Sequence, residues 1–185
     1  HEAVSRPVAE GDGARIALRH IGRDGAVSAV SFAMLDDSAS RFANVLEALD
    51  VRQGEVVFSL SGRVPAFYSA VLGTLKRGAV FCPLFSAFGP EPIRARLEIG
   101  GGVCLVTTRT LFQRKVAQIL DRLPMLRTVL LIDGTAADEG ERIRSLCARL
   151  GTPRAPVSRE IAVETARARQ RHVRRGSGSG FRKGP

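Results

Sequence analysis

Residues 73–96 read GTLKRGAVFCPLFSAFGPEPIRAR, and this stretch contains the strongest structural signals of the chain. Gly78 ends an apolar helical pattern, and the apolar run Val80–Leu84 that follows has the length of a strand. A turn then leads to Gly89–Pro92, where a proline in the first helical turn costs no hydrogen bond, so that a helix begins there. The stretch therefore predicts a helix, a strand and a second helix in succession.

The same alternation continues on both sides of this stretch. The further predicted strands and helices are, in order, strand Glu55–Leu60, a helix from Pro65, strand Val103–Val106, helix Arg109–Leu123, strand Thr128–Ile132 and helix Glu139–Leu150. Repeated strand–helix–strand units of this length predict an α/β fold. We expect a mostly parallel sheet with right-handed crossovers, flanked by helices on its faces.

The first part of the chain has a different pattern. Residues 15–21 alternate polar and apolar side chains, and a glycine-rich turn leads to Val27–Val30, which predicts a short hairpin. Ser31 is then a suitable N-cap for a helix with a single apolar stripe. The stripe consists of Leu35, Ala39, Phe42, Leu46 and Leu49. We expect residues 1–13 to form a flexible N-terminus, residues 14–150 to form the domain, and residues 151–185 to form a disordered tail.

The positive charge is concentrated in that tail. The whole chain carries a formal net charge of +10, and residues 151–185, which hold nine basic and two acidic side chains, contribute +7 of it. Such a tail can neutralise nucleic-acid phosphates without reading sequence. It contains one Phe and no recognisable binding module, so that we expect at most nonspecific contact with nucleic acid.

Composition argues against several other classes of protein. No apolar stretch approaches the about 20 residues that cross a bilayer, and the first residues lack the apolar segment of a signal peptide. The three cysteines, Cys82, Cys104 and Cys147, are odd in number and have no CxxC spacing. Cys82 and Cys104 lie in apolar runs and are expected in the core. Neither His20 nor His172 has a Cys or carboxylate partner at metal-ligand spacing, so that we expect no metal site. The cysteine pattern suits a reducing compartment, so that we expect a cytoplasmic protein.

The body of the chain resembles the N-terminal part of the adenylate-forming acyl-CoA synthetases, and most of all the acetate–CoA ligases. The segments that carry the resemblance are Ser31–Leu35, Ser40–Leu46, Val51–Val57, Gly73–Leu84 and Phe85–Ile93. The resemblance extends over roughly residues 14–134, and the stretch from Gly73 to Arg96 is its most specific part. Asp50 and Glu55 stand where such proteins usually have Gly and Asp.

The resemblance implies an activity that the chain does not carry by itself. Family members join a carboxylic acid to CoA with ATP and Mg²⁺ through an acyl-adenylate, and they are more than twice as long as this chain. The ribose-binding Asp, the aromatic-Thr-Glu motif and the C-terminal Lys of the family are absent from the sequence. We therefore expect a partial, truncated ligase domain that has no catalytic residue and binds neither ATP, Mg²⁺ nor CoA productively.

Two groups of residues are candidate binding sites by the same resemblance. Arg114 and Lys115 lie near where similar enzymes contact the CoA phosphates; a solvated helix face is the alternative that we favour. The second group, a degenerate phosphate loop, consists of Ser177, Gly178, Ser179, Gly180 and Lys183. Arg182 replaces the Pro of the family loop, and a flexible Gly/Ser linker is the alternative that the composition favours.

Phe81, Phe85 and Phe88 flank a proline-containing turn, and we expect them to pack in the core rather than to stack on a ligand.

The sequence as a whole leaves three hypotheses about function. The chain is part of an acid–CoA ligase that takes acetate or a short acyl acid, a binding or regulatory module that pairs with a full-length relative, or a nucleic-acid-binding protein that acts through its tail.

Overall fold

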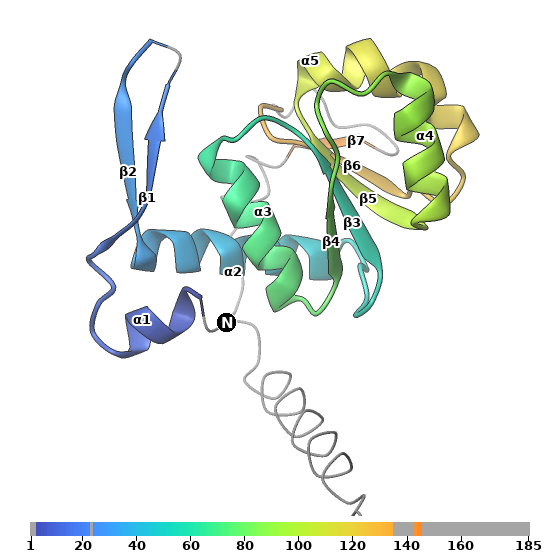
Figure 1. The fold of residues 1–185 in the computed structure, drawn as a ribbon. Helices are drawn as coiled ribbons and strands as arrows, with labels where there is room; N and C mark the ends of the chain where they lie inside the picture. Colours follow the sequence, from blue (N-terminus) through green and yellow to red (C-terminus); the bar gives the residue numbers. More distant parts are fainter. Residues whose placement is uncertain (1–2, 23, 135–142, 146–185) are drawn as a thin grey trace, which may run out of the picture. The chain divides into compact units, whose positions relative to one another are not determined.

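A five-stranded parallel sheet organises the chain (Figure 1). The structure is a computed structural model, and it describes residues 3–22 and 24–134 together with the backbone of residues 143–145. The strands of this sheet are β3 (Val56–Leu60), β4 (Val80–Pro83), β5 (Gly102–Thr107), β6 (Thr128–Leu131) and β7 (Ile143–Ser145). Their order across the sheet is β4-β3-β5-β6-β7, and all four neighbouring pairs are parallel. The predicted α/β fold with a mostly parallel sheet is confirmed.

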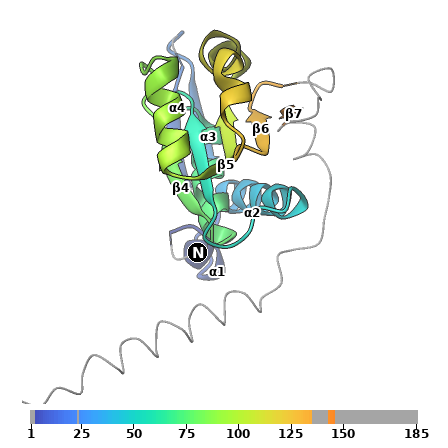
Figure 2. The same cartoon turned by 90° about the vertical axis from the view of Figure 1, so that its right-hand side faces the viewer.

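Helices cover both faces of the sheet. The helical elements are α2 (Phe32–Ala48), α3 (Pro65–Lys76), α4 (Pro90–Ile99), α5 (Arg109–Leu111), the π-helical η1 (Phe112–Val116) and the 3-10 helical η2 (Ala117–Arg122). Figure 2 shows α2 and α4 on different sides of the strands. Two buried clusters result, one beneath α2 and α3 and the other beneath α4, η1 and η2.

The central strands are apolar on both of these faces. Along β3, Val57 belongs to the cluster under α2 and α3, whereas Phe58 and Leu60 belong to the cluster under α4. Along β6, Leu130 faces the first cluster and its neighbours face the second. A parallel sheet that is covered on both sides requires such continuous apolar runs, which is why the strands could be recognised from the sequence.

The N-terminal hairpin and its helix also agree with the sequence analysis. The strands β1 (Ile16–Ile21) and β2 (Val27–Ser31) pair antiparallel, and β2 runs directly into α2. The Ser31 hydroxyl accepts a hydrogen bond of 3.2 Å from the backbone N–H of Met34, which caps α2 as predicted.

Before this hairpin the structure adds an element that the sequence analysis does not assign, the helix α1 (Ser5–Ala9). Five residues are too few to show a helical period. Long-range contacts hold the helix instead, because Val4 is buried and the Ser5 hydroxyl bonds to the Asp36 carboxylate of α2. The flexibility of residues 1–13 stays a prediction.

Two predictions about helices need correction. The single helix predicted over Arg109–Leu123 is divided into α5, η1 and η2. The helix predicted over Glu139–Leu150 is wrong at Ile143–Ser145, which form a strand parallel to β6. The hydrogen bonds that an open strand edge offers prevail there over a local helical pattern. The other residues of that predicted helix, and the tail of residues 151–185, lie outside the described residues.

Asp50, which departs from the glycine of the resembling family, has a left-handed backbone with φ of 54° just after α2. Replacing Asp50 with glycine is expected to raise the free energy of unfolding by about 0.5–1 kcal/mol, because glycine adopts this conformation without a Cβ penalty. The ion pair lost with Arg52 is largely exposed and worth little. Urea denaturation measures the change. Asp50→Ala, which removes the same carboxylate but keeps the strain, is the control and should not gain stability.

Glu55 anchors a network at the amino end of the sheet. Arg127 donates to both carboxylate oxygens of Glu55, at 3.0 and 2.8 Å, and to the Asp50 carbonyl at 3.0 Å. The Arg52 backbone N–H donates to the same carboxylate at 2.8 Å. The Arg127 guanidinium is the main reason why the pKa of Glu55 lies below its ordinary value. The network joins β3 to the segment before β6, 72 residues away.

This network predicts an acid-dependent loss of stability. Because the pKa of Glu55 is lower in the folded chain than in the unfolded chain, its contribution is complete above the unfolded pKa, near pH 4.5, and is lost as the pH falls through the folded value. Glu55→Gln is expected to cost about 1 kcal/mol at pH 7 and to cost nothing once the wild-type carboxyl is protonated. Urea denaturation at pH 7 and at a series of pH values falling below 4.5 tests this, with the exposed Glu47→Gln as control. A cost that does not decrease as the pH falls would contradict it.

Candidate functional site

The strand order creates a topological switch point between β3 and β5. These strands are neighbours in the sheet although β4 lies between them in the chain. The loop after β3 leads to α3 on one face of the sheet, whereas the loop after β5 leads to η1 on the opposite face. In open α/β sheets, ligands bind outside the carboxyl ends of the strands at such a point. The carboxyl edge of the sheet is therefore the candidate site.

Hydrogen bonds fix the backbone at this edge. The buried Thr107 hydroxyl donates to the Leu60 carbonyl at 2.8 Å and ties the end of β5 to the end of β3. The backbone N–H of Arg109 donates to the Asp133 carboxylate at 2.7 Å, which ties the start of α5 to the end of β6. Polar or basic side chains, including the exposed Arg63, follow β3 at the same edge. The edge is thus held by hydrogen bonds between strand ends and carries the exposed side chains of Arg63 and Asp133.

The loop that follows β4, residues 84–89, is held at this edge by Lys115. The Lys115 ammonium group donates to the backbone carbonyls of Ser86 at 2.6 Å and Phe88 at 2.8 Å. The Arg96 guanidinium lies 4.1 Å from the centre of the Phe88 ring, which adds a cation–π contact from α4. Lys115 therefore positions a loop, a role that the sequence does not reveal because its partners lie almost 30 residues away.

Arg114, the other candidate for contact with CoA phosphates, is exposed on η1 beside Lys115. Among residues 3–22 and 24–134 its guanidinium has no recorded hydrogen bond or ion pair. A guanidinium in this state is available to a phosphate, for which its planar donors are well suited. The structure thus separates the two basic candidates into one that holds a loop and one that remains accessible.

The expectation that three phenylalanines pack in the core is wrong for Phe85. Phe81 and Phe88 are half-buried against the two core clusters, but 66% of Phe85 is exposed. The Phe85 ring meets the Phe88 ring edge to face at 5.7 Å. Phe85 is therefore exposed at the carboxyl edge of the sheet. The sequence analysis placed it in the core because an apolar side chain after a strand gives no sign of which way it faces.

The remaining residues singled out in the sequence have different outcomes. Burial raises the pKa of the Cys82 thiol, and it raises that of Cys104 to about 12, so both thiols are protonated near neutral pH. Ser177, Gly178, Ser179, Gly180 and Lys183 of the predicted phosphate loop lie outside the described residues. In the described part of the chain, no cluster of His, Cys, Asp or Glu could hold a metal ion, and no helix is long and apolar enough to cross a membrane.

Comparison with known proteins decides the family. The sequence profile of the family described as "AMP-binding enzyme" matches residues 6–165. The chain belongs to this family. The resemblance to adenylate-forming acyl-CoA synthetases noted above is therefore confirmed.

Several members of this AMP-binding family are similar in sequence. Acetyl-coenzyme A synthetase of Bacillus subtilis is 35% identical over 107 residues, which are 57% of this chain and 18% of that protein. Its counterpart in Streptomyces coelicolor is 25% identical over 146 residues, which are 75% of this chain and 22% of that protein. The chain spans about a fifth of the length of these relatives.

Solved structures of AMP-binding enzymes share the fold. The acyl-CoA synthetase of Brucella canis matches with a TM-score of 0.72 and 28% identity over 84% of this chain and 28% of its own. The acetoacetyl-CoA synthetase of Streptomyces lividans matches with a TM-score of 0.70 and 23% identity over 84% of this chain and 25% of its own, which shows the fold alone.

Proposed function

We propose that this chain provides the N-terminal α/β unit of an AMP-forming acid–CoA ligase that acts on acetate or another short carboxylic acid. The complete reaction joins the acid to CoA with ATP, through an acyl-adenylate, and releases AMP and pyrophosphate. The family match over residues 6–165 is the observation that carries this proposal. The similarity to acetyl-coenzyme A synthetases supports the choice of a short acid.

The unit contributes to the reaction without catalysing it alone. Adenylation requires that ATP, Mg²⁺ and a carboxylate are held together in one geometry, and misplacement of one reactant removes most of the rate enhancement. The ribose-binding Asp, the aromatic-Thr-Glu motif and the C-terminal Lys that hold them in the family are missing from the 185 residues. The loop of residues 177–183, with Arg182 in place of Pro, is a poor substitute for the phosphate loop.

Within this unit, Arg114 is the residue that contacts the phosphates of CoA. Its guanidinium is exposed on η1, directly beside the Lys115 contact with the loop of residues 84–89. The exposed Phe85 ring lies in that loop and offers an apolar surface to the nucleotide base. Lys115 takes no direct part and keeps the loop in place.

Two experiments test the proposed function. The purified chain should show no acetate-dependent ATP–pyrophosphate exchange, and acyl-AMP made by it unaided would overturn the claim of inactivity.

In the second experiment, residues 14–134 should replace the corresponding segment of Bacillus subtilis acetyl-coenzyme A synthetase with activity retained. In that chimera, Arg114→Ala is expected to raise the KM for CoA about tenfold and to leave acetate-dependent exchange unchanged. Arg122→Ala, on the neighbouring η2, is the control. A chimera that folds but makes no acetyl-CoA would contradict the proposal.

Nucleic-acid binding through residues 151–185 stays a separate prediction that rests on their net charge of +7. A salt-sensitive shift of DNA that disappears when these residues are deleted would support it. Unchanged mobility of DNA at low salt would exclude it.

A further inference from the structure

The sequence contains three Asp-Gly pairs, at residues 12–13, 24–25 and 133–134. In such a pair the glycine nitrogen can attack the side-chain carboxyl carbon of the aspartate, because glycine has no Cβ that blocks the approach. A bond forms between this nitrogen and that carbon, the carboxyl group loses one oxygen as water, and a five-membered succinimide results. Because the three pairs share this chemistry, the fold decides which of them reacts.

Water then opens the succinimide at one of its two carbonyl carbons. Opening at the side-chain carbonyl restores aspartate. Opening at the main-chain carbonyl breaks the original peptide bond and leaves the glycine nitrogen bonded to the side-chain carbon, which gives isoaspartate with a free α-carboxylate. The cycle consumes the water that it released, so that the conversion needs neither an oxidant nor a reductant.

Long-range contacts hold the pair at residues 133–134. The Asp133 carboxylate accepts a hydrogen bond of 2.7 Å from the backbone N–H of Arg109, 24 residues away. Gly134 is buried, and its N–H donates to the Leu131 carbonyl at 3.2 Å. Ring closure would require the carboxyl group to leave Arg109 and the buried nitrogen to turn away from Leu131. The fold therefore protects this pair.

The pair at residues 12–13 is held from both sides. The Arg15 guanidinium donates to the Asp12 carboxylate at 2.6 Å and turns it away from Gly13. The Gly13 carbonyl accepts a hydrogen bond of 2.9 Å from the backbone N–H of Ala33 in α2. A Cβ built at Gly13 would lie 3.4 Å from Cβ of Ala33, so that the backbone here is packed against the start of α2. Ring closure would have to disturb this packing.

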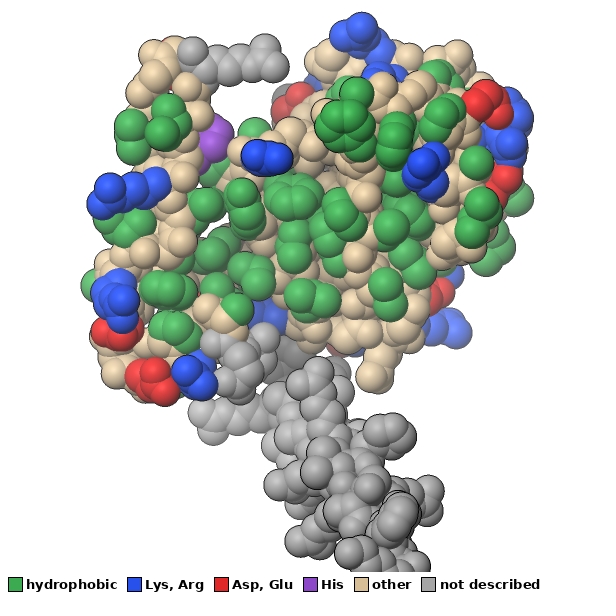
Figure 3. All heavy atoms as spheres, in the orientation of Figure 1, with side chains coloured by type: hydrophobic (Ala, Val, Ile, Leu, Met, Phe, Trp, Pro, Cys, Tyr) green, Lys and Arg blue, Asp and Glu red, His purple; other side chains and the backbone are tan. Residues whose placement is uncertain are grey.

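Asp24 and Gly25, by contrast, lie exposed at the tip of the β1–β2 hairpin. Gly25 has φ of 79°, and no atom lies within 4 Å of a Cβ built on it. Its N–H donates to the Gly22 carbonyl at 3.0 Å, a contact within the tip itself. Figure 3 shows the hairpin as a narrow projection that no other described residue covers in this view. The tip can therefore open locally while the two strands stay paired.

The Asp24 side chain is also folded toward the atom that would attack it. Its Oδ1 accepts a hydrogen bond of 3.1 Å from the backbone N–H of Ala26, which places the carboxyl group over residue 25 in an Asx-turn. A Cβ built at Gly22 would lie 2.4 Å from the same Oδ1, so that the carboxyl group points into the turn. We propose that Asp24 is a modification site, which isomerises spontaneously to isoaspartate in the folded chain and does so faster than Asp12 or Asp133.

The product changes the tip of the hairpin and leaves its stem in place. Isoaspartate lengthens the backbone by one methylene group between Ile21 and Val27, the last paired residues of the two strands. The Ser31 cap of α2 lies at the other end of β2. The circular dichroism spectrum should therefore persist while the reaction proceeds. The inference concerns this hairpin alone and does not depend on the proposed function.

Incubation of the full chain at pH 7 in water that contains oxygen-18, with and without guanidinium chloride, tests the proposal. Each opening of a succinimide adds one heavy oxygen, which mass spectrometry of proteolytic peptides locates, and chromatography separates isoaspartyl from aspartyl peptides. In the folded chain we expect the Asp24 peptide to gain heavy oxygen about fivefold faster than the Asp12 and Asp133 peptides, because each of those pairs must break a further hydrogen bond. In guanidinium chloride the three rates should become similar. Equal rates in the folded chain, or a faster reaction at Asp12 or Asp133, would overturn the proposal.

Asp24→Glu assigns the reaction to this residue. The variant keeps the negative charge, but its longer side chain would have to close a less favourable six-membered ring. Heavy oxygen should therefore disappear from that peptide and continue to enter the Asp12 and Asp133 peptides as before. Asp12→Glu is the matched control and should leave the rate at Asp24 unchanged. Heavy oxygen that still enters the peptide of the Asp24→Glu variant would place the reaction at another residue and contradict the assignment.

Discussion

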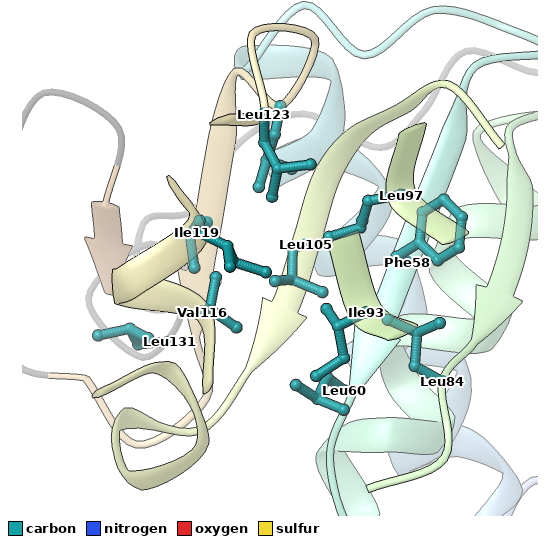
Figure 4. Packing of buried hydrophobic residues seen from close by; sticks show 12 residues of the cluster. Phe58, Leu60, Leu84, Ile93, Leu97, Leu105, Val116, Ile119, Leu123 and Leu131 are labelled. Atoms are coloured by element: carbon teal, nitrogen blue, oxygen red, sulfur yellow. The ribbon is translucent and has the colours of Figure 1, made fainter. Parts of the chain in front are cut away.

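Phe58→Ala is expected to lower the free energy of unfolding by about 4 kcal/mol, the largest effect that we predict for a single substitution. Phe58 lies in the central strand β3 and is 1% exposed. Its ring lies beside Leu97 of α4 (Figure 4). It also packs against the backbone at Gly100 and Gly102. Truncation removes the apolar contacts and leaves a cavity that two glycines and a rigid strand cannot fill.

Urea denaturation followed by circular dichroism measures this loss. The matched control is Phe85→Ala, since 66% of that phenylalanine is exposed, and it should change stability by less than about 1 kcal/mol. Similar losses for the two variants would show that Phe58 does not occupy the centre of the core.

A double-mutant cycle tests the fit between ring and backbone. A Cβ added at Gly102 would lie 2.6 Å from Cδ2 of Phe58, closer than two carbon atoms can approach. Gly102→Ala should therefore cost much less stability in the Phe58→Ala background than in the parent. Additive losses would contradict a direct contact.

Gly73→Ala is expected to lower the free energy of unfolding by about 2–3 kcal/mol, although alanine favours a helix by about 1 kcal/mol over glycine. The added Cβ would lie 2.6 Å from the Ala39 carbonyl oxygen and 2.8 Å from Cβ of Phe42, both on α2. Neither atom can move without moving that helix, so that α2 and α3 must separate. The hydrogen bond of 2.9 Å between the Ser38 and Ser69 hydroxyls, which joins the same two helices, would be weakened with them.

The control for this substitution is Gly62→Ala. No atom lies within 4 Å of a Cβ built at Gly62, and its backbone does not require glycine. We expect a change within about 0.5 kcal/mol, measured by the same denaturation. If Gly73→Ala were as mild as Gly62→Ala, the close crossing of α2 and α3 would be wrong.

Local patterns predicted much of the fold. Gly78 and Gly89–Pro92 placed the end of α3, the strand β4 and the start of α4, and Ser31 placed the start of α2. These signals depend on backbone conformation and periodicity within a few residues, which the sequence displays directly. The strand at Ile143–Ser145 was missed because its hydrogen bonds come from β6, and a local pattern contains no information about that partner.

The candidate site was less predictable for the same reason. Lys115 was a candidate for contact with a phosphate, with a solvated helix face as the alternative, but its ammonium group binds carbonyls of a loop that precedes it by almost 30 residues. The Arg127 contact with Glu55 spans 72 residues. Neither residue has a periodic or local signature, because an ion pair or a loop contact depends on which strands become neighbours. The exposure of Phe85 could not be predicted from local sequence either, since it depends on the path of the chain after β4.

The place of β3 between β4 and β5 has a consequence for synthesis on the ribosome. One side of this apolar strand can pair once residue 83 has emerged, but its other side needs residues 102–107. At a translation rate of about 5–20 residues per second, the second partner is complete roughly one to five seconds later. During that interval β3 exposes one edge with unpaired backbone N–H and C=O groups and apolar side chains. A chaperone that binds apolar extended segments could therefore bind residues 56–60 of the nascent chain.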